Sequence, residues 1–398
     1  MRSTKFFACA LVLLLSSSPV LALPRGPLRC MGGFAGPYPC RAVDQASHFP
    51  LSDLSNAQSE AVRVVLGWTD EASGRELAVV SLRTRISFVE VTDPENPEVI
   101  GDLRGDALGS MAIYRDHLYA VLGVADAKLE IFDLSHVLSA PDPPVRFVAD
   151  ASYDLRLSGR LSINEETGFA YVVSGGGPFT PGLMVALDLN DDLEAPEEVF
   201  AWNLGPAPRS LECVLYHGAD SRFAGHEICF GATAPRSMVV YDFSDKENPV
   251  RLSRAFYKPF NNPWHLALTT DHRFLLLADS HDEHLPGGNT RTFLFDLSSL
   301  TAPVHFMTYQ GPARARDLHL EVRGRFAFLA NARAGLRVLD LRQIAKGRVR
   351  EVGFFDVEPE KNSSDWFGAA SLDVLPSGTV IVGSVRQGLY VLKPRLPS

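Results

Sequence analysis

A short motif recurs along this chain and constrains its fold more than any other feature. It reads as a strand, an acidic residue, a turn and a second strand, as in FVEVTDPENPEVIG (88–101) and MVVYDFSDKENPVRL (238–252). Proline ends the first strand because it lacks an amide hydrogen and fixes φ. The copies are about 50 residues apart, a spacing typical of propellers and solenoids. Their acidic position falls at Glu90, Asp133, Asp188, Asp242, Asp296, Asp340 and, in a truncated last copy, at Lys393.

Two more short strands precede each copy, such as SMAIY (110–114) and HLYAVL (117–122). Four β-branched and aromatic strands per unit, joined by Gly, Asp and Pro turns, make one blade of a β-propeller. No stretch shows sustained helical periodicity. We therefore predict an all-β, seven-bladed propeller of four-stranded blades, with its core on the two middle strands of each blade. Six or eight blades remain the alternative.

The last unit has no fourth strand after Lys393. An open ring would leave exposed strand edges, so we expect the segment around residues 41–66 to close the ring.

The N-terminus resembles a secretory signal. It has a positive start, an apolar run and a small-residue exit, so we expect cleavage after Ala22. The apolar run is too short to span a membrane. We divide the chain into a signal peptide (1–22), a cysteine-containing segment with the ring-closing strand (23–60) and the propeller (61–398). The mature protein is expected to be a secreted or periplasmic monomer without a membrane span.

Four cysteines remain outside that signal: Cys30, Cys40, Cys213 and Cys229. An even number in an exported chain favours disulfides, with three connectivities to choose from. The simplest pairs are Cys30–Cys40 and Cys213–Cys229, because each closes a short loop and the second joins consecutive strands. A zinc site is the alternative, but the sequence has no Cys-x-x-Cys spacing.

The charge of the chain and the absence of common motifs argue against several classes of function. The net charge is −9 with both signs mixed along the chain, so there is no basic stripe to indicate a nucleic-acid partner. The sequence also lacks Gly-x-Ser-x-Gly, a phosphate-binding Walker loop and His-Glu-x-x-His. Trp68 and Trp366 are interpreted as packing anchors.

Several segments, taken in order, resemble the choice-of-anchor B family of LVIVD-repeat β-propellers over nearly the whole mature chain. They include CMGGFAGPYPC (30–40), GWTDEASGRELAVVSL (67–82), INEETGFAYVVSG (163–175), TDHRFLLLADSHDE (270–283) and the terminal GLYVL (388–392). The C-terminus LYVLKPRLPS carries no sorting motif, so a form free of the cell surface is expected. In the family, histidine-containing pairs stand near the start of the strands expected to line the channel, where they would suit a metal site.

The corresponding positions in this chain carry other residues. Arg160 and Arg209 replace histidine pairs, and two arginines can hold a carboxylate or phosphate through bidentate hydrogen bonds. A permanent cation would repel a metal ion, so the site would select anions. The simpler interpretation, which we favour from sequence alone, is solvated or ion-paired loop residues. The candidate ligand-binding residues at the channel are Arg160, Arg209, Glu212, His265, Asp317 and His319.

The stretch DSHDEH (279–284) is a weaker candidate for a metal site. Asp279, Asp282 and Glu283 match the family pattern, and their oxygens suit calcium or another divalent metal. His281 and His284 would add transition-metal ligands. A solvated acidic turn is the favoured alternative.

Two function classes follow. The first is a binding or scaffold propeller that recognises a protein, a glycan or a small anion. The alternative is a metal-dependent, hydrolase-like enzyme with His265, Asp317 and His319 at the channel mouth, an argument by analogy with other propellers. Metal analysis of the purified protein separates the two.

Overall fold

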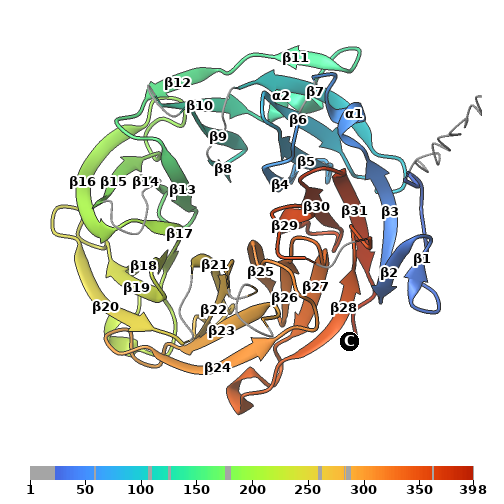
Figure 1. The fold of residues 1–398 in the computed structure, drawn as a ribbon. Coiled ribbons are helices and arrows are strands. Elements are labelled where there is room, and N and C mark those ends of the chain that lie inside the picture. The colour runs from blue at the N-terminus through green and yellow to red at the C-terminus, as the bar shows by residue number, and fades with distance from the viewer. Residues whose placement is uncertain are drawn as a thin grey trace, which may run out of the picture.

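The computed structural model describes residues 23–57, 60–105, 110–123, 127–174, 181–258, 262–281, 283, 288–360 and 363–397. Seven antiparallel sheets stand like blades around a central channel (Figure 1). This confirms the prediction of a seven-bladed β-propeller and excludes six or eight blades. The expected signal peptide lies outside the described residues. Within the part of the chain that is described, no helix is long and apolar enough to cross a membrane.

The first three blades follow one another along the chain, each from an inner strand at the channel to an outer strand at the rim. Blade 1 comprises β4 (Val64–Thr69), β5 (Glu76–Ser81), β6 (Arg85–Glu90) and β7 (Glu98–Arg104). Blade 2 comprises β8 (Ser110–Tyr114), β9 (His117–Leu122), β10 (Lys128–Asp133) and β12 (Ala151–Asp154). Blade 3 comprises β13 (Gly159–Asn164), β14 (Phe169–Ser174), β15 (Pro181–Asp188) and β16 (Glu197–Pro206).

The next three blades have the same order of strands. Blade 4 comprises β17 (Pro208–Leu215), β18 (Glu227–Thr233), β19 (Ser237–Asp242) and β20 (Val250–Phe256). Blade 5 comprises β21 (Pro263–Leu268), β22 (Phe274–Asp279), β23 (Arg291–Asp296) and β24 (Val304–Gln310). Blade 6 comprises β25 (His319–Arg323), β26 (Phe326–Ala330), β27 (Leu336–Asp340) and β28 (Arg350–Phe355).

Blade 7 combines the two ends of the chain. It comprises β29 (Ala369–Val374), β30 (Val380–Ser384), β31 (Gly388–Pro394) and, as its outer strand, β3 (Val43–Phe49). The pairing of β3 with β31 is antiparallel and runs from Val43 opposite Pro394 to Phe49 opposite Leu389. The predicted ring closure by an N-terminal strand is therefore confirmed.

The repeated aspartate of the motif has a local structural role. From blade 2 to blade 6 the third strand ends at this aspartate, and its Oδ1 accepts the backbone N–H two residues further on at 2.8–3.0 Å. Such Asx-turns redirect the chain without a special backbone conformation. The residues concerned are Asp133, Asp188, Asp242, Asp296 and Asp340.

The core lies on the middle strands, as predicted. Every residue of β5, β18 and β22 is buried. Their side chains meet those of the next blade; Phe230 of blade 4 and Leu277 of blade 5, for example, share one apolar cluster. Each such buried side chain contributes about 1.5–3 kcal/mol, so the contacts between blades hold the ring together. The described helices are short: α1 (Leu51–Leu54), α2 (Ser135–Leu138) and two 3₁₀ turns (Ser221–Phe223 and Ile344–Lys346).

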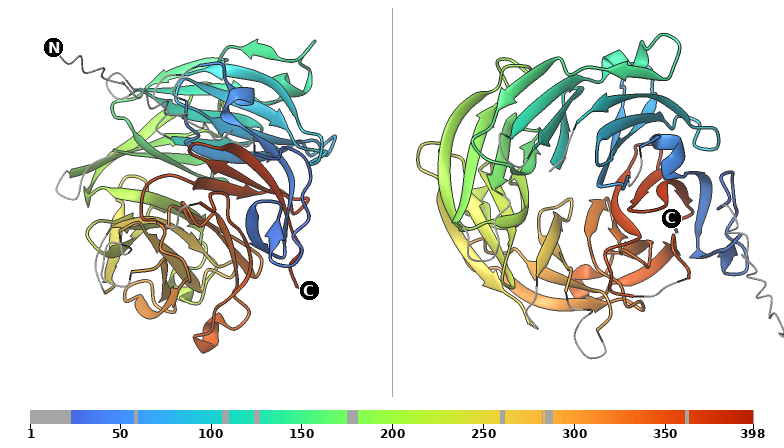
Figure 2. Two further views of the ribbon diagram at one scale, coloured as in Figure 1. Left: turned by 45° about the vertical axis from the view of Figure 1, so that its right-hand side comes forward. Right: turned by 45° about the horizontal axis from the view of Figure 1, so that its top comes forward.

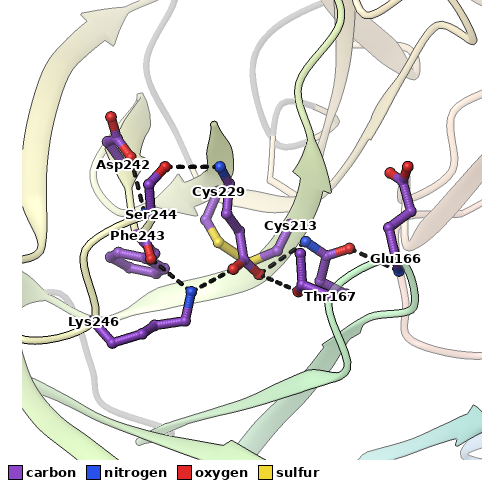
Figure 3. Close-up of a disulfide and its surroundings, with 10 residues drawn as sticks. Glu166, Thr167, Cys213, Cys229, Asp242, Phe243, Ser244 and Lys246 are labelled. Atoms are coloured by element: carbon purple, nitrogen blue, oxygen red, sulfur yellow. Dashed lines mark hydrogen bonds and ion pairs between the residues drawn. A yellow bond between two sulfur atoms is a disulfide. The ribbon is translucent and has the colours of Figure 1, made fainter. Parts of the chain in front are cut away.

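Both predicted disulfides are present. Cys30–Cys40 fastens the hairpin of β1 (Phe34–Ala35) and β2 (Tyr38–Arg41), which extends the outer edge of blade 6 by pairing with β28. Figure 2 shows this blue hairpin beside the red C-terminal blades. Cys213 and Cys229 are directly opposite each other in β17 and β18 and are bonded there (Figure 3).

One strand departs from the sequence prediction. In the repeat copy that contains Asp133, the strand after the acidic turn is β11 (Val145–Phe147), which pairs parallel with β7 of blade 1 and does not form the outer strand of its own blade. The outer strand of blade 2 is β12, four residues later. Gly101 allows the close approach of β11, because a Cβ there would lie 2.1 Å from the carbonyl oxygen of Val145.

Candidate binding site in the central channel

A cavity of about 700 Å³ occupies one end of the central channel. Its wall is formed by the first residues of the inner strands together with loops of blades 1 and 7. The described lining includes four arginines, Arg63, Arg83, Arg160 and Arg209, and none of the described lining residues is an aspartate or a glutamate. This concentration of positive charge contrasts with the net charge of −9 for the whole chain.

Three consecutive blades place a cationic or aromatic side chain that lines the cavity at the second position of their inner strand. These are Arg160 of β13, Arg209 of β17 and Trp264 of β21. Both guanidinium groups lie over the indole of Trp264, with Cζ at 5.6 Å (Arg160) and 5.0 Å (Arg209) from the ring centroid. Such cation–π contacts contribute about 0.5–2 kcal/mol and hold the cation without neutralising it.

Neither guanidinium has an anionic partner among the residues that the structure describes. Within the described residues, Arg160 and Arg209 make no ion pair and no side-chain hydrogen bond, and Nε of Arg209 is buried without a partner. Burial lowers the pKa of Arg160 and the charge of Arg209 lowers it further, while burial lowers the pKa of Arg209. Arginine stays charged even so. Two like charges are thus held close to each other in a partly dehydrated site.

His265 and His319 stand beside these arginines. Their ring centroids are 4.1 Å apart in an edge-on contact, and both line the cavity. Burial, then His319 and Arg160, hold the pKa of His265 well below its usual value. Burial lowers the pKa of His319 to about 4, against the attraction of Asp373. Both imidazoles are therefore neutral at pH 7.

Part of this wall has a structural role. Each inner strand is an edge strand, and its channel-side N–H groups need acceptors. Side chains of the preceding blade supply them: Leu268 N–H donates to Oε2 of Glu212 (3.2 Å) and Leu372 N–H to Nδ1 of His319 (3.2 Å). Gly67 N–H likewise donates to Oδ2 of Asp373 (2.7 Å).

Glu212 lies next to the cavity. It follows the lining residue Ser210 by two positions on β17 but is not itself part of the described lining. Burial raises its pKa to about 7, although the N–H of Leu268 favours the ionised form. Glu212 therefore carries only part of a negative charge at neutral pH and cancels only part of the positive field of the arginines.

Asp317 is not brought into the cavity. It is 1% exposed, and its Oδ2 accepts the backbone N–H of Arg291 at 2.8 Å. Of the six sequence candidates, the structure gathers Arg160, Arg209, His265 and His319 in one cavity, sets Glu212 behind them and places Asp317 elsewhere.

The weaker metal candidate is only partly described. Asp279 is fully buried, and its carboxylate accepts Tyr257 Oη–H (2.5 Å) and the N–H groups of Asn262 and His281 (3.1 and 2.9 Å). Asp282 and His284 lie outside the described residues. Of the residues that are described, no group of three or more His, Cys, Asp or Glu can hold a metal ion.

Glu283, the third carboxylate of that candidate, is fully buried, and its two oxygens have no side-chain hydrogen-bond partner within the described residues. Burial raises its pKa to about 7.

Two tryptophans of the cavity were not among the sequence candidates. Trp264 contacts Trp366 with ring centroids 5.1 Å apart, and Trp366 in turn lies over Arg316 at 4.0 Å. Trp366, interpreted above as a packing anchor, is 41% exposed and lines the cavity. Trp264 had one signal in the sequence: it occupies the same strand position as the two arginines.

Comparison with known proteins supports the fold and leaves the site unassigned. No family model and no curated protein matches this chain. The WD40 β-propeller domain of Doa1 is similar at a TM-score of 0.55 and 13% identity, over 91% of this chain and 99% of that one. A Lactobacillus plantarum protein gives 0.55 and 12% over 81% and 88%, and Kuenenia stuttgartiensis hydrazine synthase 0.59 and 11% over 86% and 99%. At these identities the likeness shows a β-propeller and nothing finer.

Proposed function

We propose that this protein is a binding propeller whose central cavity holds an anionic group of its ligand. The observation that carries the proposal is the pair of guanidinium groups of Arg160 and Arg209, which share the indole of Trp264 without an acidic partner in the described structure. Propellers commonly serve as binding scaffolds, and the cavity opens on the channel of this one.

The physical reason is charge compensation. Two cations held close together repel each other, and the repulsion is stronger where burial has removed water. A carboxylate or phosphate between them relieves that repulsion and accepts charge-assisted hydrogen bonds, each worth about 1.5–3 kcal/mol. Neutral His319 accepts the N–H of Leu372 at Nδ1, so its Nε2–H can donate one further hydrogen bond.

The test is anion-dependent thermal stability. Phosphate, sulfate and acetate are titrated against the protein at constant ionic strength, and a rise in Tm is expected with at least one of them. Arg160→Ala combined with Arg209→Ala is expected to abolish the rise while the far-ultraviolet circular dichroism stays unchanged. Arg273→Ala is the matched control, because Arg273 is an exposed arginine stacked on Phe274 at 5.1 Å outside the cavity. If a divalent metal stabilises the protein and no anion does, the site binds cations and the proposal is wrong.

The metal-dependent enzyme remains the second candidate class. Two neutral imidazoles in contact suit a divalent metal. The third residue of that hypothesis is Asp317, but its Oδ2 accepts a hydrogen bond from the N–H of Arg291. Stoichiometric metal in the purified protein would favour this class.

Export and family membership belong to the same proposal. Two disulfides support an oxidising compartment, and the repeat pattern supports a place among the choice-of-anchor B propellers. We propose a secreted or periplasmic protein cleaved after Ala22. Edman sequencing of the exported protein is expected to begin at Leu23; an uncleaved cytoplasmic product would refute this.

A further inference from the structure

We infer that the ligand of this cavity is a carboxylic acid with an apolar, ring- or chain-shaped body, and that it is neither a sugar acid nor a bare inorganic anion. The inference rests on the anion site proposed above and adds the class of molecule. It comes from the juxtaposition of the guanidinium pair with an apolar wall across one cavity.

The apolar wall lies on the side of the ring opposite the arginine pair. Arg160 and Arg209 come from blades 3 and 4, whereas half-buried Val64 and Leu66 come from β4 of blade 1 and Val385 follows β30 of blade 7. These side chains are neither closed off in the core nor fully in solvent. A ligand that covers them removes apolar surface from water, which contributes about 25 cal/mol per Å².

Trp366 extends the apolar surface of the cavity towards the arginine pair, because its ring contacts Trp264, over which both guanidinium groups lie. It is 41% exposed, and it lines the cavity next to Trp264. Large aromatic side chains with an open surface at the edge of a cavity are strong contact points for apolar and aromatic groups. The wall thus offers a platform for a ring within reach of the guanidinium pair.

The polar groups of the wall do not suit a sugar. Apart from the arginines and histidines, the described lining offers side-chain hydrogen bonds only through the hydroxyls of Ser110, Ser210 and Ser371 and the indole N–H groups of Trp264 and Trp366, and it contains no Asp, Glu, Asn or Gln. Ser371 Oγ already accepts the N–H of Val65 at 3.2 Å. The lining is therefore rich in donors and poor in side-chain acceptors, so a polyhydroxylated ligand would bury hydroxyl protons without acceptors, at about 1–3 kcal/mol each.

The size of the cavity also favours a ligand with an apolar body over an inorganic anion. A volume of about 700 Å³ lies within the usual range for small-molecule sites, roughly 300–1,000 Å³. An inorganic phosphate would fill a small part of it and leave the apolar wall in contact with water. A bicyclic carboxylate can reach the arginines and the wall together.

The experiment compares four probes by isothermal titration calorimetry: 2-naphthoate, glucuronate, inorganic phosphate and neutral 2-naphthol. We expect 2-naphthoate to bind at least tenfold more tightly than each of the others. Trp366→Ala is expected to weaken 2-naphthoate about tenfold and to leave phosphate binding unchanged. Val385→Ser provides a second, smaller change to the wall should Trp366→Ala fold poorly. Trp202→Phe is the matched control, because Trp202 of blade 3 packs on Phe243 of blade 4 and does not line the cavity.

The outcomes separate this inference from the proposed function. If no anion binds, the anion site itself is refuted and the inference falls with it. If glucuronate or phosphate binds as tightly as 2-naphthoate, the anion site stands and the apolar-body inference is wrong. If 2-naphthol matches 2-naphthoate, the cavity is an apolar site that does not use the charge of its arginines, which overturns both.

Discussion

A buried ion pair between Glu227 and Lys246 fastens blade 4 to blade 3. Glu227 is 3% exposed, and its Oε1 accepts hydrogen bonds from Nδ2 of Asn164 and Oγ1 of Thr167, each at 2.8 Å. Its Oε2 lies 2.5 Å from Nζ of Lys246, which also donates to the carbonyl oxygen of Phe243 (Figure 3). Asn164 and Thr167 belong to blade 3, whereas the ion pair belongs to blade 4. The carboxylate therefore connects two blades.

The perturbation is Lys246→Met, which keeps the length of the side chain and removes its charge. Removing one partner of a fully buried ion pair costs about 3–5 kcal/mol. Here the cost should be smaller, about 2 kcal/mol, because two neutral donors still hold Glu227 and hydrogen bonds to a charged group are each worth about 1.5–3 kcal/mol. Glu227→Gln keeps an acceptor for Asn164 and Thr167 and should cost about 1 kcal/mol. The double variant should cost at least 0.5 kcal/mol less than the sum of the two.

The assay is urea unfolding at pH 7 with the disulfides intact, followed by both fluorescence and circular dichroism so that coincident transitions test two-state behaviour. Lys128→Met is the control, because its ion pair with Asp154 is exposed on both sides and should change the free energy of unfolding by less than about 0.5 kcal/mol. Strictly additive effects, or a cost of Lys246→Met no larger than that of the control, would refute the argument that Glu227 depends on its cation.

Two further predictions concern the disulfide and pH. Cys213→Ala with Cys229→Ala opens a loop with a sequence separation of 16 and should lower the free energy of unfolding by about 3 kcal/mol in the chain-entropy model; free thiols or a Cys40–Cys213 link in a non-reducing peptide map would contradict the pairing. Burial raises the pKa of Glu212 in the folded state to about 7. Between pH 5 and 7 the folded protein therefore keeps a proton on Glu212 that the unfolded chain has lost. Because the folded state binds more protons, the contribution of Glu212 to the free energy of unfolding falls as pH rises. Glu212→Gln should therefore flatten the pH dependence and raise the free energy of unfolding at pH 8, by at most about 3 kcal/mol; an unchanged slope in urea titrations at pH 5, 6, 7 and 8 would exclude this role.

The repeat pattern predicted the fold because the interactions behind it join residues that are close in the sequence. An aspartate such as Asp242 ends its strand by accepting a hydrogen bond from the N–H two residues further on. Each aspartate of this kind marks the third strand of one blade, so their number in the sequence predicts the number of blades. Cys213 and Cys229 stand on consecutive strands, whose pairing follows from hairpin geometry alone.

The contacts of the site between blades could not be predicted in this way. Arg160, Arg209 and Trp264 meet because three inner strands start at the same height in the ring, and no local period encodes the side-chain distance between neighbouring blades. Asp317 is two residues from His319 in sequence, yet its carboxylate turns to the N–H of Arg291. The pairing of β11 with blade 1 likewise depends on the close approach of Val145 to Gly101, and these two residues are far apart in the sequence.

The strand that closes the ring also sets the order in which the protein can mature. β3 is synthesised long before its partner β31, with Val43 paired to Pro394. Contacts this distant along the chain form slowly, because a long loop must close before they contribute. Until β31 arrives, β3 and β30 each keep an unpaired edge that can associate with another chain. A chain that is truncated before β31 therefore lacks the strand that pairs with β3, and its blade 7 cannot close the ring.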